Sequence, residues 1–232
     1  MIEPVAAILP SIHREGYVFI MSFILATLVC FAFSKTIGWI GIILTLWCVY
    51  FFRDPDRVTP IDKSLIISPA DGLVQAIQKA PPPPELNMEA KELTRVSIFL
   101  NVFDVHVNRV PISGVVKNLS YHPGKFLNAS LDKASKDNER QSILIETDDR
   151  QEIVVVQIAG LIARRIVCNL NDKQKVKAGA RFGIIRFGSR VDVYLPAGIE
   201  PMVLEGQRVI GGETVLANLI GEQKKRHGKV YK

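Results

Sequence analysis

The pattern of apolar and polar positions changes once along the chain, near residue 65. Before that point lie two uncharged apolar stretches, 17–33 and 39–52. At 1.5 Å per residue they predict helices about 25 and 21 Å long, against a membrane hydrocarbon core of about 30 Å. Each is short for a clean crossing, so we expect a helical hairpin over 17–52 that enters a membrane from one side. A hairpin buried in a soluble core is the alternative.

From residue 65 onward the pattern is that of β-strands, with short apolar or alternating runs separated by turn-forming residues. The runs expected to form strands cover 65–68, 72–78, 95–100, 104–110, 114–121, 141–147, 152–160, 164–168, 181–187, 190–195 and 208–219. Two glycine-containing turns are similar to those of barrel-sandwich folds such as biotinyl and lipoyl carrier domains. The sequence therefore predicts a mainly β, sandwich or barrel-sandwich-like domain that follows an α-helical hydrophobic hairpin.

These patterns divide the chain into five segments. They are a polar lead-in (1–16), the hairpin (17–52), a charged, proline-containing linker (53–64), the β-rich domain (65–221) and a basic tail (222–232). We expect the tail to be disordered or to lie on a lipid surface. Four prolines at 81–84 predict a stiff exposed loop, and the stretch 125–140 predicts a loop or a short helix.

Charge and cysteine content limit the binding partners and the cellular compartment that fit this chain. The net charge of +6 suits nucleic acid or anionic lipid, and the apolar hairpin favours lipid, so no nucleic-acid partner is expected. Cationic residues on both sides of the hairpin predict that its two ends lie at the cytoplasmic face of the cell membrane. Cys30, Cys48 and Cys168 have no paired or ligand-like spacing, which predicts a reducing compartment, no disulfide framework and no metal site.

A Gly-Ser pair interrupts the clearest strand pattern of the domain. Gly188 and Ser189 lie between two alternating apolar runs, and glycine inside a strand often marks a bulge or a close backbone approach. Glycine also adopts dihedrals denied to other residues, which can strain the next peptide bond. The Ser189 hydroxyl would lie within reach of that bond, as an N-to-O acyl shift, the first step of peptide self-cleavage, requires. A plain glycine bulge is the alternative.

Two further motifs carry side chains suited to acid–base chemistry. Asp71 lies in Ser-Pro-Ala-Asp-Gly after the first expected strand, where a turn-forming Asp-Gly is the plain alternative. In DVHVNRVP, alternation places His106 and Asn108 on one face of a strand and two valines on the other. His122, in Tyr-His-Pro-Gly, is the other histidine of the β-rich domain, and a surface position beside a turn is its plain interpretation.

Taken in order, the motifs resemble those of one enzyme family. They are Arg-Asp-Pro after the apolar segment, Ala-Asp-Gly, the histidine motif that ends in Val-Pro, and the Gly-Ser pair. The chain resembles the phosphatidylserine decarboxylases, in their short bacterial proenzyme type with an N-terminal membrane segment, and the resemblance covers essentially all of it.

The resemblance implies an activity and its cofactor. The chain would cut itself between Gly188 and Ser189, giving a heterodimer of a large β chain (1–188) and a small α chain (189–232), with higher oligomers left open. Ser189 would become a covalent pyruvoyl group that forms a Schiff base with phosphatidylserine, and CO2 and phosphatidylethanolamine would be released. No metal or diffusible cofactor is implied.

The resemblance also implies roles for the polar residues. A carboxylate and a histidine act with the cleavage serine much as in a serine hydrolase triad, which implies Asp71 and His106 as partners of Ser189. Longer relatives carry two histidines three residues apart, and the second is the self-cleavage base. Here Arg109 stands at that second position, and a guanidinium is a poor base. Either His106 serves both steps or His122 substitutes.

Two other functions fit parts of the sequence. A membrane-tethered carrier or binding module of the biotinyl or lipoyl type would need a lysine between methionines at a hairpin tip, and the chain has no Met-Lys-Met run. A pyruvoyl decarboxylase for a soluble amino acid would not need the apolar hairpin at 17–52. Both fit the sequence less well than a lipid decarboxylase.

Overall fold

The structure is a computed structural model that describes residues 10–89, 92–129, 137–161, 165–186, 188–221 and 223–228. Parts of several expected segments therefore lie outside the described residues: 1–9 of the lead-in, 130–136 of the expected loop or helix, Arg164 and Phe187 in two expected strands, and 222 and 229–232 of the tail. The chain divides into two units, Met1–Asp56 and Arg57–Lys232. The boundary falls inside the expected linker.

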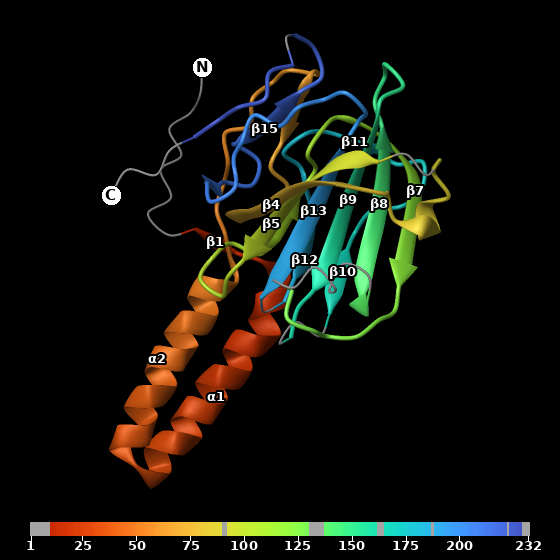
Figure 1. The fold of residues 1–232 in the computed structure, drawn as a ribbon. Coiled ribbons are helices and arrows are strands. Elements are labelled where there is room, and N and C mark those ends of the chain that lie inside the picture. Colours follow the sequence, from red (N-terminus) through yellow and green to blue (C-terminus); the bar gives the residue numbers. More distant parts are fainter. Residues whose placement is uncertain are drawn as a thin grey trace. The chain divides into compact units, whose positions relative to one another are not determined.

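The first unit is a pair of apolar helices, α1 (Tyr17–Phe33) and α2 (Lys35–Phe51), as the pattern predicts (Figure 1). The helices pack closely where Gly41 faces Thr27, because a Cβ at Gly41 would lie 2.7 Å from Thr27 Oγ1. A short pairing of β1 (Ser11–Ile12) with β2 (Arg53–Asp54) joins the two ends. With the 3₁₀ turn η1 (Arg14–Gly16), the first helix is long and apolar enough to cross a membrane, whereas α2 is shorter.

The second unit is built from strands, which confirms the mainly β prediction. Its main sheet is antiparallel, with the strand order β11-β7-β8-β9-β13-β5-β4-β14. In chain order these strands are β4 (Gly72–Ala80), β5 (Leu93–Leu100), β7 (Gly114–His122), β8 (Arg140–Glu146), β9 (Glu152–Ala159), β11 (Lys175–Val176), β13 (Ser189–Leu195) and β14 (Arg208–Val209). Figure 1 shows β8, β9 and β13 side by side in the curled sheet.

Smaller elements cover the two faces of the main sheet. A three-stranded sheet contains β6 (Val107–Arg109), β10 (Ile166–Cys168) and β12 (Arg181–Ile185), and a two-stranded sheet pairs β3 (Leu65–Ile67) with β15 (Val215–Asn218). These strands and one face of the main sheet enclose the main apolar core, which includes Ile66, Phe182 and Val193. On the other face, a smaller apolar cluster includes Leu86 from the 3₁₀ turn η2 (Pro84–Leu86) and Tyr194.

Three local expectations differ from the structure. The expected run 208–219 forms two strands, because a turn with Gly212 at φ +84° separates β14 from β15. The expected run 104–110 contributes only β6, since the residues before it form a loop. The proline run is not wholly exposed: Pro82 and Pro83 are buried, and Leu86, shortly after them, is anchored in the smaller apolar cluster.

Candidate active site

Ser189 is the first residue of β13 and lies between two neighbouring strands. It pairs with Leu100 of β5 and with Ala159 of β9. Because side chains alternate along a strand, Ser189 faces the same side as Val191 and Val193, which belong to the main core. Its side chain is fully buried, and its Oγ has no hydrogen-bond partner among the residues the structure describes. A buried hydroxyl in this state costs free energy, which favours a chemical use over a structural one.

The peptide bond before Ser189 has an unusual backbone setting. Gly188 adopts φ +67°, in the left-handed region that glycine tolerates best. A Cβ on Gly188 would meet no atom within 4 Å, so this position needs glycine for its conformation alone. Gly160 has the opposite role: a Cβ there would lie 2.2 Å from the carbonyl oxygen of Gly188. The missing side chain of Gly160 therefore makes room for the carbonyl of the 188–189 peptide.

His106 lies beside this peptide, at the end of the loop between β5 and β6. The backbone N–H of Gly188 donates to His106 Nε2 over 3.3 Å. The other ring nitrogen, Nδ1, lies 3.0 Å from the backbone carbonyl oxygen of Asp104. Because a carbonyl only accepts, Nδ1 carries the hydrogen, and Nε2 holds the lone pair that accepts from the Gly188 N–H. His106 is fully buried, and its basic nitrogen faces Gly188.

The loop that positions His106 is held by the Asp104 side chain. Its carboxylate accepts a hydrogen bond from the backbone N–H of Asn101 over 2.9 Å and pairs with Arg208 of β14. The Asp104 side chain is 6% exposed. Because the Asp104 side chain is held in this way, the direction of the Asp104 backbone carbonyl is fixed. That carbonyl in turn fixes the ring orientation of His106.

Asp71 lies in the turn before β4, and both of its carboxylate oxygens accept hydrogen bonds. Oδ2 accepts from Arg57 over 2.7 Å, and Oδ1 accepts from the backbone N–H of Gly211 over 2.8 Å. The Arg57 and Asp71 side chains are largely buried. Asp71 therefore joins the start of the second unit to the turn between β14 and β15.

The strand register places Asp71 at the same end of the main sheet as Ser189. The residue after Asp71 is level with Leu100, which pairs with Ser189. The two positions are two strands apart, or about 10 Å at the usual strand spacing. The structure thus brings Asp71 to the end of the sheet that carries Ser189, whereas the group that faces Nδ1 of His106 is the carbonyl of Asp104.

Arg109, at the position of the second histidine of longer relatives, has a different environment. Its backbone N–H donates to the carbonyl of Pro69 over 2.8 Å, and its Nη1 donates to the carbonyl of Gly179 over 3.0 Å. Its side chain also packs on Gly212, where a Cβ would lie 2.7 Å from Arg109 Cδ. Alternation along β6 directs it away from the face that carries Asn108.

The structure does not bring His122 to Ser189. His122 is the last residue of β7 and pairs with Arg140 of β8. Arg140 is level with Ile158 of β9, which in turn pairs with Arg190 of β13. Residues paired in this way point to the same face of a sheet, so His122 lies three strands from β13 and on the face opposite Ser189.

Two features of this region were not predicted from the sequence: the space at Gly160 and the contact of Asn108 with Gln157. Gln157 Nε2 donates to Asn108 Oδ1 over 2.8 Å, and both side chains are fully buried. The available signal was a single amide in the apolar run 152–160, followed at its end by glycine.

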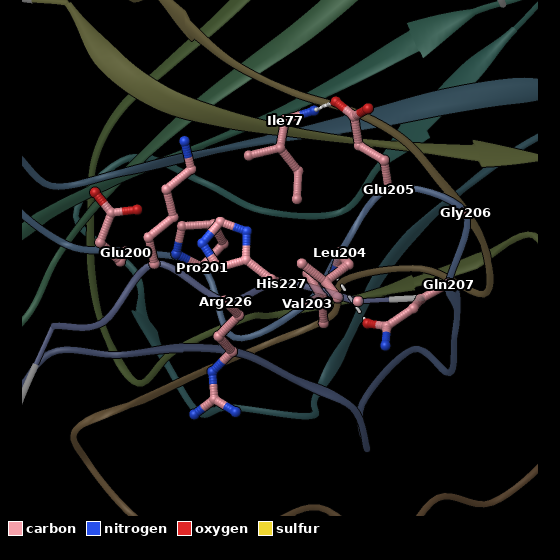
Figure 2. A pocket seen from close by; sticks show the side chains of 12 residues that line it. Ile77, Glu200, Pro201, Val203, Leu204, Glu205, Gly206, Gln207, Arg226 and His227 are labelled. Atoms are coloured by element: carbon pink, nitrogen blue, oxygen red, sulfur yellow. Dashed lines mark hydrogen bonds between the residues drawn. The ribbon is translucent and has the colours of Figure 1, made fainter. Parts of the chain in front are cut away.

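A cavity of about 610 Å³ lies elsewhere in the second unit (Figure 2). It is lined by Ile77, by residues between 200 and 207 and by 225–228 of the tail. Figure 2 shows the backbone N–H of Ile77 bound to the Glu205 carboxylate, over 2.7 Å. None of the four candidate catalytic residues lines this cavity, so it is separate from the place where the candidate chemistry gathers.

Comparison with known proteins agrees with this geometry. A family model described as phosphatidylserine decarboxylase matches residues 44–217, which is more than half of the chain. The chain belongs to the phosphatidylserine decarboxylase family. Relatives named phosphatidylserine decarboxylase proenzyme include those of Rickettsia typhi and Rickettsia prowazekii, each 60% identical over 207 residues, and that of Rickettsia felis, 61% identical over 207 residues. These alignments cover 89% of this chain and 90% of each relative. Membership in the phosphatidylserine decarboxylase family removes the carrier-module interpretation.

Proposed function

We propose that this chain is a proenzyme that cuts itself between Gly188 and Ser189 and then converts phosphatidylserine to phosphatidylethanolamine and CO2. One observation carries the proposal: a buried imidazole and a buried hydroxyl both adjoin Gly188, with His106 Nε2 3.3 Å from the Gly188 nitrogen and Ser189 next in the chain. Family membership and the proenzyme names of the relatives support the same reaction.

Self-cleavage begins at the Ser189 hydroxyl. His106 exchanges its bond with the Gly188 N–H for one with Ser189 Oγ and accepts the Oγ proton as a general base. Oγ then forms a bond to the carbonyl carbon of Gly188, and the bond from that carbon to the Ser189 nitrogen breaks. The proton passes from the imidazole to the leaving nitrogen, and the product is an ester. Gly160 contributes because it has no side chain, which leaves room for the carbonyl of Gly188 in its reactive position.

The ester then yields the cofactor. Loss of the Cα proton of residue 189 and of the Gly188 carboxylate gives dehydroalanine, which water converts to a pyruvoyl group and ammonia. The chains are then 1–188 and 189–232. Once formed from Ser189, the pyruvoyl group would supply a carbonyl that can bind the amine of the lipid and an electron sink for the pair left by CO2. The residues present fit this group, because it forms from Ser189 in place and needs no separate cofactor pocket.

The geometry supports a division of roles among the candidate residues. We assign the base of self-cleavage to His106, which adjoins the cleavage site. Asp71 acts as a positioning residue through Arg57 and the turn at Gly211. His122 receives no catalytic role, because it lies on the opposite face of the sheet.

We further propose that the first unit anchors the enzyme at the cytoplasmic face of the cell membrane, where its lipid substrate is found. The segment Arg14–Phe33 is long and apolar enough to cross a bilayer. Apolar side chains of both helices, such as Leu25 and Ile43, are exposed, and contiguous exposed apolar surface marks a membrane or partner contact. Arg14 and Arg53 flank the hairpin in the sequence, which favours ends on the cytoplasmic side.

The test uses the full chain purified in detergent. Denaturing electrophoresis and mass spectrometry should show two fragments, 1–188 and a pyruvoyl-terminated 189–232, and carboxyl-labelled phosphatidylserine should release labelled CO2. Ser189→Ala should stay whole and inactive, whereas Ser64→Ala, a serine in a distant turn, should cleave normally. A wild-type chain that stays intact while it releases CO2 would overturn the proposal.

A further inference from the structure

A pair of buried amides beside Ser189 has no part in the chemistry described above. Gln157 of β9 donates to Asn108 of β6 and so joins the main sheet to the three-stranded sheet. Gly183, opposite Asn108 on β12, leaves room for this contact: a Cβ there would lie 3.2 Å from Gln157 Nε2. The packing of three strands is therefore arranged around the amide pair.

The amide pair retains an unused NH2 group and an unused carbonyl oxygen. Asn108 Nδ2 and Gln157 Oε1 have no hydrogen-bond partner within the described parts of the chain. Rotating both amides by 180° exchanges the two roles but again leaves one NH2 group and one carbonyl oxygen unused. Buried polar groups in proteins nearly always have partners, so an unused pair of this kind indicates a ligand.

The strand register places the amide pair next to the cleavage residue. Ala159 pairs with Ser189, and Gln157 lies two residues earlier on β9, on the same face of the sheet. Diagonal neighbours of this kind are about 7–8 Å apart. Asn108, in β6, follows His106 by only two positions in the chain. The amide pair, the imidazole and the hydroxyl are therefore all fully buried at neighbouring backbone positions.

We propose that the Asn108–Gln157 pair binds the serine headgroup of the substrate, an inference that rests on the proposed function. The free N–H donates to the carboxylate of phosphatidylserine, and the free carbonyl oxygen accepts from the nitrogen on the same carbon. The headgroup thus has an acceptor, the carboxylate, next to a donor, the nitrogen. These complement the unused donor and acceptor of the amide pair. Since Ser189 is fully buried in the uncleaved chain, binding follows self-cleavage, when the new end at residue 188 can move away.

A neutral amide suits a carboxylate that must leave as CO2. The carboxylate loses its negative charge in the transition state, so a cation bound to it would stabilise the substrate more than the transition state and slow the reaction. An amide N–H orients the carboxylate with a weaker interaction. The product, phosphatidylethanolamine, lacks the carboxylate and would lose this hydrogen bond.

The experiment measures adduct formation rather than turnover. The matured enzyme is mixed with detergent micelles that contain phosphatidylserine or phosphatidylethanolamine, and sodium cyanoborohydride reduces the amine adduct at residue 189, which mass spectrometry then quantifies. For Asn108→Leu or Gln157→Met, the half-saturating phosphatidylserine concentration should rise about 10-fold or more, as expected for a lost charge-assisted hydrogen bond, while that for phosphatidylethanolamine changes less than about twofold. Asn118→Leu, which alters a half-buried amide on β7, should change neither value.

A parallel measurement needs no variant. On the wild-type enzyme, the carboxyl methyl ester of phosphatidylserine should require a half-saturating concentration close to that of phosphatidylethanolamine. Equal half-saturating concentrations of the ester and of phosphatidylserine would overturn the proposal. An equal rise in the half-saturating concentrations of both lipids in the variants would also overturn it. A folded variant that fails to cleave would place the pair in self-cleavage and also overturn it. A wild-type chain that forms no adduct with either lipid would instead refute the proposed function.

Discussion

Two buried polar clusters on opposite faces of the main sheet differ in how far their hydrogen-bonding capacity is used. On the outer face, Arg140 donates two hydrogen bonds to the two oxygens of Glu85, over 2.6 and 2.9 Å, and Ser142 adds a third over 2.8 Å. The Arg140 and Glu85 side chains are only 7% and 12% exposed. On the core face, Ser189 Oγ and Asn108 Nδ2 are buried without a partner among the described residues.

The difference separates structural from functional polar groups. Burial alone would raise the pKa of the Glu85 carboxyl, but hydrogen bonds from Arg140, from its own backbone and from Ser142 lower it to about 2. The hydrogen-bond acceptors of Glu85 are thus occupied by groups that hold the fold together. The core-face groups keep their capacity for a reaction or a ligand, at a cost in stability.

The largest expected effect comes from the core face. Replacing His106 by glutamine removes the only base that adjoins Gly188 in the described structure, and general-base catalysis is worth about 10²–10⁴-fold. Self-cleavage of His106→Gln should therefore slow by about 10³-fold or more, measured as fragment appearance against time on denaturing gels. His122→Gln is the matched control and should cleave at the wild-type rate. The reverse pattern would make His122 the base.

The outer cluster should respond in stability instead. Glu85→Gln breaks one partner of a buried ion pair, which costs about 3 kcal/mol of unfolding free energy. Thermal or chemical unfolding in detergent measures this loss, and self-cleavage below the melting temperature should proceed normally. Glu146→Gln, in a more exposed pair with Lys117, should lower stability much less, because water screens an exposed ion pair. Slow cleavage in a folded Glu85→Gln protein would contradict the division between the two faces.

The same cluster predicts a dependence of stability on pH. The pKa of Glu85 is about 2 in the folded chain, against 4.5 for an ordinary glutamate. Because the folded value is the lower one, the contribution of Glu85 is fully present above about pH 4.5 and is lost as the pH falls toward 2. The unfolding free energy of Glu85→Gln should therefore fall less steeply across this window than that of the wild type.

A single methyl group at Gly160 should slow cleavage by more than its effect on stability explains. The added Cβ would lie 2.2 Å from the carbonyl oxygen of Gly188, and a displacement of about 1 Å at a reacting group can cost about 10²-fold. Gly114→Ala is the matched control, because its Cβ would lie 2.3 Å from the carbonyl of Glu146, at the opposite end of the sheet. Both variants should lose similar stability, and only Gly160→Ala should cleave slowly. Equal cleavage rates would show that Gly160 serves packing alone.

The fold was largely predictable because its strands are local patterns. The alternation around 141–147 and 190–195 predicts β8 and β13 to within one residue at each end, and the uncharged stretches predict both helices. The two-residue strand β11 was missed, because Lys175–Val176 is too short to show a period. The expected run 208–219 was divided by a turn that its sequence pattern does not distinguish from a glycine within a strand.

The candidate site was predictable only where a motif lies in one segment. Gly188, Ser189 and His106 each stand out in their own run of sequence. The contact between Asn108 and Gln157 spans 49 positions and depends on how two sheets pack, which no local pattern encodes. The position of the Asp104 carbonyl beside His106 is equally hidden, because a backbone carbonyl has no sequence signal.

Asp71 should give the smallest effect among the site residues. Asp71→Asn keeps an oxygen for the Gly211 N–H but weakens the pair with Arg57, so self-cleavage should slow about tenfold, in line with a positioning residue that holds part of the site through its partners.

The variant Arg57→Gln distinguishes two ways in which Asp71 could act: through Arg57, or by orienting the His106 imidazole directly. If Asp71 acts through Arg57, both variants should slow fragment appearance by similar factors. A carboxylate that orients the catalytic imidazole directly is worth about 10⁴-fold in a serine protease triad. A loss of that size in Asp71→Asn, with Arg57→Gln at the wild-type rate, would show that the carboxylate reaches His106 in the reactive state. The Asp104 carbonyl would then orient the ring only before the reaction begins.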